Sequence, residues 1–173
     1  MFTTPTNGVV TSVKNLWEEL RKKGHDVRIL TLSEGIDSYK EEDVYYIKSI
    51  PLEFIYPDVR MPISYHNSLI KELIDWKPDV VHSQCEFFSF HYAQRIAKLT
   101  GAPLVHTYHT LYEQYVAYVI PGKHLGKRMV QQMSRIRLKG VNVIIAPTVK
   151  VEDTLREYGL ENSIQVVHSG ISL

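Results

Sequence analysis

The sequence predicts an α/β fold in which helices cover both faces of a doubly wound parallel sheet. Short apolar runs of strand length alternate with longer segments whose apolar residues recur at helical spacing, and this alternation is typical of a parallel sheet. At 173 residues, with 44% hydrophobic side chains, the chain is long enough to bury one sizeable core. We therefore predict one domain over residues 1–173.

Each element is placed by a local pattern. Helices are placed where apolar residues recur every three or four positions before a glycine, as before Gly24 and Gly101. Strands are placed at short apolar runs bounded by polar turns. The opening residues, 2–8, are predicted to form the end of a strand followed by a loop. The elements expected after it are helix 9–20, strand 26–32, a weaker strand at 45–47, helix 67–76, strand 80–82, a helix ending before 101, strand 103–107, a helix opening at 110, helix 124–139, strand 141–146, helix 149–158 and strand 165–167.

The composition limits the partners of the chain. Lys and Arg number 20 against 19 for Asp and Glu, so no overall field attracts nucleic acid, and we predict no nucleic-acid partner. The single cysteine, Cys85, forms no internal disulfide, and the amino terminus lacks the pattern of a secretory signal. No apolar run approaches the ~20 residues that cross a bilayer. A cytoplasmic location fits best, with any membrane contact made at the surface.

Loops that follow strands are the expected ligand sites, because open α/β sheets bind ligands at the carboxyl ends of their strands. In the first such loop Asn7 and Gly8 precede a helix, where backbone N–H groups and the helix dipole favour an anion such as phosphate. The same dipeptide is also an ordinary turn. After the strand at 80–82, Glu86 is a candidate to orient an acceptor hydroxyl, or simply a cap for the next helix.

The segment from His106 to Glu113 is the most informative of these loops. Strand alternation directs His106 into the surroundings of the sheet and leaves His109 on the loop beyond it, facing the crevice. Two histidines three residues apart raise the possibility of zinc, but the sequence offers no convincing further ligands, so we predict no metal site. Thr110 and Glu113 match a helix capping box, which gives Glu113 a structural role.

The helix expected at 124–139 is basic and amphipathic. Leu125, Met129, Met133 and Ile136 recur on one side, and most of the cations lie on the other. Such a helix either binds an anionic membrane surface, with about 1 kcal/mol from each cation, or packs against the core and leaves a charged face in water. The cations expected at the membrane are Lys123, Lys127, Arg128, Arg135, Arg137 and Lys139.

Several motifs stand in a characteristic order along the chain: Asn7-Gly8-Val9-Val10-Thr11-Ser12-Val13, Gly24-His25-Asp26-Val27, Pro78-Asp79-Val80-Val81-His82, and His106-Thr107-Tyr108-His109-Thr110 with Tyr112-Glu113. In this order and spacing they resemble the amino-terminal domain of group 1 (family four) retaining glycosyltransferases. The resemblance covers essentially the whole chain, including the approach to an interdomain linker at 146–148 and 166–171.

The resemblance implies a GT-B architecture, in which this chain is the acceptor-side, Rossmann-like half. By position, the loop of Asn7, Gly8 and Val9 would contact the donor diphosphate, and His109 would hydrogen-bond the transferred sugar and support the charge that develops at its anomeric carbon. Glu86 and Tyr108 are the expected acceptor contacts. The implied reaction transfers a hexosyl group from a nucleotide sugar with retained configuration, without a cofactor and usually without a metal.

Within this family, the segments 7–9 and 109–115 are most similar to diacylglycerol glucosyltransferases of Gram-positive bacteria. That similarity implies a lipid acceptor and a peripheral position at the inner face of the cell membrane. Val9 stands where many family members have a second glycine. The family's donor-binding second domain has no counterpart in these residues, so we expect little turnover from this chain alone. The alternatives are a soluble sugar or metabolite as acceptor, or a non-catalytic Rossmann-like binding module.

Overall fold

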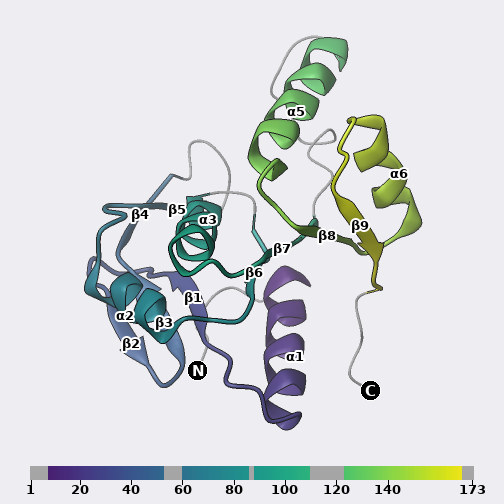
Figure 1. Cartoon of the computed structure of the whole chain (residues 1–173). Helices are drawn as coiled ribbons and strands as arrows, with labels where there is room; N and C mark the ends of the chain where they lie inside the picture. Colours follow the sequence, from purple (N-terminus) through teal and green to yellow (C-terminus); the bar gives the residue numbers. More distant parts are fainter. Residues whose placement is uncertain (1–7, 53–59, 86–87, 110–122, 169–173) are drawn as a thin grey trace. The chain divides into compact units, whose positions relative to one another are not determined.

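A computed structural model describes residues 8–52, 60–85, 88–109 and 123–168 of the chain (Figure 1). The chain divides into two compact units. Among the described residues, the first unit holds 8–81 and 88–102, and the second holds 82–85 and 103–168. No helix within the described ranges combines the length and apolar character that crossing a membrane requires.

Strands β1 and β3 pair in parallel in the first unit, with Ile29 opposite Val44. Strand β2 adds to β3 in antiparallel orientation through a turn in which Glu42 takes a positive φ of 51°. Strands β4 and β5 form a separate antiparallel pair. The elements of this unit are α1 (Gly8–Lys22), β1 (Ile29–Leu32), β2 (Tyr39–Glu41), β3 (Val44–Ile47), β4 (Ser49–Pro51), β5 (Arg60–Pro62), α2 (Ser68–Trp76) and α3 (Phe88–Thr100).

The core of the first unit lies where α2 and α3 pack against each other (Figure 1). Strand β3 is buried along its whole length, and apolar residues of both helices complete the cluster. Burying a large apolar side chain stabilises a fold by about 1.5–3 kcal/mol, so these contacts position the strand ends of this unit. The buried members are Tyr45, Ile47, Ile70, Leu73, Tyr92 and Ile96.

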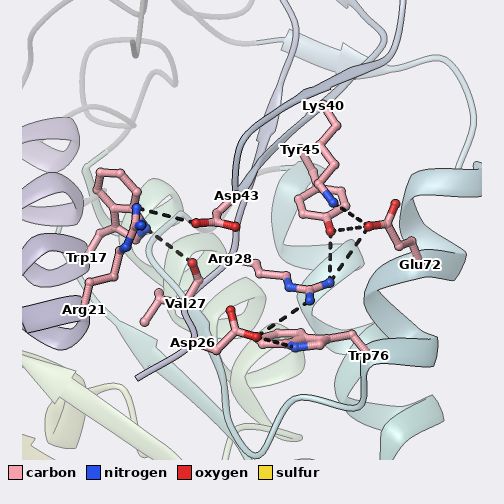
Figure 2. Close-up of polar contacts among 10 residues, drawn as sticks. All are labelled: Trp17, Arg21, Asp26, Val27, Arg28, Lys40, Asp43, Tyr45, Glu72 and Trp76. Atoms are coloured by element: carbon pink, nitrogen blue, oxygen red, sulfur yellow. Dashed lines mark hydrogen bonds and ion pairs between the residues drawn. The ribbon is translucent and has the colours of Figure 1, made fainter. Parts of the chain in front are cut away.

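A polar network crosses this unit at the amino-terminal end of β1 (Figure 2). Arg28 lies over the ring of Trp76, 4.3 Å from its centroid, and donates to the Tyr45 hydroxyl at 3.1 Å. That hydroxyl donates to Glu72 at 2.7 Å, and Lys40 donates to the same carboxylate at 2.6 Å. The hydrogen bonds from Lys40 and Tyr45 lower the pKa of Glu72. Ligands of open α/β sheets bind at the opposite, carboxyl ends of the strands, so this network stabilises the fold.

The second unit contains a four-stranded sheet in the order β6-β7-β8-β9. Strands β7, β8 and β9 pair in parallel, and α6 packs against β8 and β9 (Figure 1). Thr148 caps α6 by accepting a hydrogen bond from the backbone N–H of Val151. The elements of this unit are β6 (Val81–Ser83), β7 (Leu104–Thr107), α5 (Lys123–Leu138), β8 (Val143–Ala146), α6 (Val149–Glu157) and β9 (Ser163–Val166).

The predicted α/β class, with parallel strands and flanking helices, is confirmed. The strand predicted at 26–32 begins only at Ile29, whose backbone N–H donates to the Asp43 carbonyl. Strands β2, β4 and β5 were not predicted. The helix expected to open at residue 110 lies outside the described residues.

Candidate functional site

A chain of polar contacts joins the ends of β6 and β7 in the second unit. His82 on β6 has its Nε2 atom 2.8 Å from Oγ1 of Thr107 on β7. Gln84, directly after β6, has its amide nitrogen 3.0 Å from the same His82 atom and its Oε1 atom 2.7 Å from Nε2 of His109. His109 lies two residues beyond β7 and is partly buried. The structure therefore places this histidine on the loop predicted from the sequence and holds it through Gln84.

The His82 ring is neutral at physiological pH. Burial, and then the neighbouring rings of His106 and His109, lower the pKa of His82 from 6.5 to about 4. A neutral imidazole has one N–H donor and one lone-pair acceptor. His82 therefore keeps one hydrogen-bonding state throughout the neutral pH range.

The His82→Asn variant should lose less stability in acid than the wild type. Between pH 6.5 and about 4 the unfolded chain protonates His82 and the folded chain does not, so stability falls as the pH falls. The full effect is about 3 kcal/mol, of which about 2 kcal/mol has developed by pH 5. Urea unfolding at pH 7 and pH 5 measures it, with His25→Asn at an exposed histidine as the control. Equal acid losses in the wild type and in His82→Asn would contradict this assignment.

His106 and Tyr108 belong to the buried part of the second unit. The His106 side chain is 0% exposed and Tyr108 is 1% exposed, and their rings meet edge to face with centroids 6.3 Å apart. The predicted inward direction of His106 is confirmed. Tyr108, which we predicted as an acceptor contact, packs in the interior, and Glu86, the other acceptor candidate, lies outside the described residues.

The glycine of the first loop begins α1. Gly8 is exposed, and a Cβ atom added to it would meet no described atom within 4 Å. Packing within the described protein therefore does not require a glycine here. A close-approaching ligand at the helix amino terminus would explain it, because the backbone N–H groups and dipole of such a terminus favour an anion. Val9 follows in the same helix and is partly buried, and Asn7 lies outside the described residues.

The basic helix is α5, and its apolar row faces outward. Met129, Met133 and Ile136 are 44%, 52% and 67% exposed. Val130, Ser134 and Leu138 form the buried face instead. The sequence left open the alternative that this helix packs its methionine row into the core. This part of α5 does not do so.

The cations of α5, and Lys139 directly after it, differ in their surroundings. Arg128 and Lys139 are exposed and Arg137 is partly buried. Arg135 is exposed, but its Nε donates to the backbone carbonyl of Tyr158, at the carboxyl terminus of α6. The side chains of Lys123 and Lys127 lie outside the described part of the structure. Arg135 thus has a structural role beside any contribution to surface charge.

Within the described ranges, no three His, Cys, Asp or Glu side chains come together as a metal site would require. Of the polar chain, the sequence predicted a site role only for His109, and it missed His82, Gln84 and Thr107. The available signal for Gln84 was its position directly after a predicted strand, because the loops after neighbouring strands of such a sheet meet at one edge.

Similar proteins were found among curated sequences. An alpha-monoglucosyldiacylglycerol synthase of Streptococcus pneumoniae is 32% identical over 96% of this chain and 38% of its own length. An enzyme of the same name from Acholeplasma laidlawii is 28% identical over 96% of this chain and 44% of its own length. A sulfoquinovosyl transferase of Arabidopsis thaliana is 27% identical over 64% of this chain and 22% of its own length.

The chain thus spans less than half the length of the curated relatives it matches. The observed α/β fold with parallel strands is that expected for the amino-terminal half of a GT-B glycosyltransferase. Residues 6–173 match the sequence pattern of Glycosyltransferase Family 4, and the chain belongs to this family.

Proposed function

We propose that this chain is the amino-terminal, acceptor-side domain of a retaining glycosyltransferase that transfers glucose from a nucleotide sugar to diacylglycerol. The names of the two bacterial relatives support the glucosyl group, the alpha configuration and the lipid acceptor. A retaining enzyme makes an alpha product from an alpha-linked donor. A second domain, outside the 173 residues, would supply most of the donor site, so we expect the chain alone to be nearly inactive.

The observation that carries the lipid assignment is the outward face of α5. Three large apolar side chains in one row are exposed, at Met129, Met133 and Ile136. The exposed cation Arg128 lies on the neighbouring stripe of the same helix, and the exposed Lys139 directly follows the helix. Exposed apolar rows usually indicate a binding surface. A row of apolar side chains beside cations matches the interface of an anionic bilayer, where apolar groups enter the acyl region and cations meet the headgroups.

Gly8 and His109 would serve the transfer itself. The backbone at Gly8 would bind the donor diphosphate at the amino terminus of α1, where an added Cβ meets no described atom and a phosphate can approach. His109 would hydrogen-bond the transferred sugar and support the charge that develops at its anomeric carbon. Neither group needs a metal for these roles, so we propose a metal-independent reaction at the inner face of the cell membrane.

Reversing Arg128 of α5 and Lys139, the residue directly after this helix, should weaken vesicle binding. Each cation near an anionic leaflet contributes about 1 kcal/mol, so Arg128→Glu/Lys139→Glu should weaken binding at least ~30-fold. Arg135 stays unchanged because it also contacts Tyr158. The measurement is sedimentation of the chain with phosphatidylglycerol-containing vesicles and with phosphatidylcholine vesicles, at low and moderate salt.

The matched control is Lys98→Glu/Lys150→Glu, which makes the same number of Lys/Arg-to-Glu reversals at exposed residues of α3 and α6. It should retain most of the binding. Equal losses in both double variants would mean that only net charge matters. Absence of binding by the wild-type chain to either vesicle would contradict the membrane proposal and favour a soluble acceptor.

A further inference from the structure

The side-chain amide of Gln84 lies between two histidine rings of the second unit. Its Oε1 atom is 2.7 Å from Nε2 of His109, and its Nε2 atom is 3.0 Å from Nε2 of His82. An amide accepts hydrogen bonds at its oxygen and donates them from its nitrogen. In this orientation His109 must present a proton to Gln84, and His82 must present a lone pair.

His82 can meet that requirement. Burial keeps its ring neutral at pH 7, with a pKa of about 4, so one of its nitrogens carries a lone pair. Two groups that are able to donate, the Gln84 amide nitrogen and the Thr107 hydroxyl at 2.8 Å, converge on Nε2. Convergence of donors at Nε2 places the His82 proton on Nδ1. This tautomer of His82 agrees with the orientation of the Gln84 amide in the structure, where the amide nitrogen is also 3.4 Å from Nδ1 of His82 and the amide oxygen lies toward His109.

We propose that Gln84 is a positioning residue for His109: it accepts a hydrogen bond from the His109 Nε2–H group and thereby fixes both the direction of the ring and the nitrogen that carries its proton. Nδ1 of His109 is then the nitrogen that carries the lone pair. The functional meaning of this contact rests on the proposed role of His109 in sugar transfer. The hydrogen bond itself can be measured without any transfer.

The opposite orientation of the amide makes a different set of predictions. With its nitrogen toward His109, Gln84 would donate to that ring, and His109 would carry its proton on Nδ1. His82 would then carry its proton on Nε2 and share it between Gln84 and Thr107. The protonated nitrogen of His109 therefore distinguishes the two arrangements.

Long-range ¹H–¹⁵N correlation spectra of the 173-residue chain, labelled at histidine nitrogens, test the proposal at neutral pH. The expected result for His109 is a protonated Nε2, an unprotonated Nδ1 and an Nε2–H proton slow enough in exchange to be observed. Gln84→Ala should remove that slowly exchanging proton. The matched control Gln132→Ala, at an exposed glutamine of α5, should retain it. A proton on Nδ1 of His109, or an Nε2–H unchanged by Gln84→Ala, would overturn the proposal.

Gln84→Glu tests the contact between residue 84 and His109 even if the alanine variant does not fold, whereas the protonated nitrogen of His109 tests the orientation of the amide. A carboxylate keeps the acceptor beside His109 and adds a negative charge within hydrogen-bond distance, so the midpoint of the His109 ring titration should rise by about one to two pH units. An unchanged midpoint would also overturn the proposal. These readouts involve neither donor nor lipid, so their failure is separate from a failure of vesicle binding, which tests the proposed function.

Discussion

Replacing His109 with alanine should lower the turnover of the full-length enzyme by about 10²–10³-fold, which is the usual effect of removing one preorganised group that stabilises transition-state charge. His109 follows strand β7, at the strand end where open α/β sheets bind their ligands. Its ring lies 2.7 Å from the Gln84 amide, so it is held in place before the substrate arrives. Turnover is measured with a nucleotide sugar and diacylglycerol in mixed vesicles.

The same variant should leave vesicle binding unchanged, because His109 lies outside α5. His25→Ala, at an exposed histidine of the first unit, should keep wild-type turnover. A His109→Ala enzyme with turnover within about threefold of the wild type would remove this residue from the catalytic machinery. It would favour the alternative in which the chain is a non-catalytic binding module.

Local signals explain why the helices within the described residues were predicted well. Asn67 caps α2 by accepting a hydrogen bond from the N–H of Leu69, which is a contact between residues two apart. Gly24 and Gly101, which follow α1 and α3, both take the positive φ that favours glycine at a helix end. Caps and terminal glycines act within one turn of helix, so a single sequence displays them completely.

The small strands of the first unit depend on partners far along the chain. Strand β4 pairs with β5, with Ser49 opposite Pro62. Arg60 joins them to the end of β1 by donating from its Nε atom to the Ser33 carbonyl at 3.0 Å and to the Ser49 hydroxyl at 2.8 Å. Neither the spacing of apolar residues nor any turn signal reveals such pairing, because β2 and most of β4 are exposed and have no buried face.

The candidate site likewise combines features that the local sequence predicts with features that depend on distant parts of the chain. The place of His109 on the loop after β7 follows from strand alternation, which is local. Its contact with Gln84 joins residues 25 positions apart and depends on β6 and β7 being neighbours in the sheet. The outward direction of the α5 methionine row also could not be predicted, because amphipathic spacing defines the faces of a helix and does not say which face is buried.

Truncating Tyr45 should have the largest effect on stability. This side chain is 0% exposed, lies in the core of the first unit and carries the hydroxyl at the centre of the network in Figure 2. Tyr45→Ala leaves a cavity between β3 and its neighbours and removes the partner of Arg28 and Glu72. Truncation of a buried aromatic residue costs about 3–5 kcal/mol, a large part of the roughly 5–15 kcal/mol that holds a domain together.

Tyr45→Phe separates the contribution of the packed ring to stability from that of the hydroxyl, because it keeps the ring and removes only the hydroxyl. It should cost about 1 kcal/mol, since Glu72 keeps its hydrogen bond from Lys40 and the surrounding charged groups still reach solvent. Tyr39→Phe, at a half-exposed tyrosine of β2, is the matched control and should be close to neutral. Urea unfolding of the three variants measures these differences. If Tyr45→Phe lost as much stability as Tyr45→Ala, the hydroxyl network rather than the packed ring would dominate the stability of this unit.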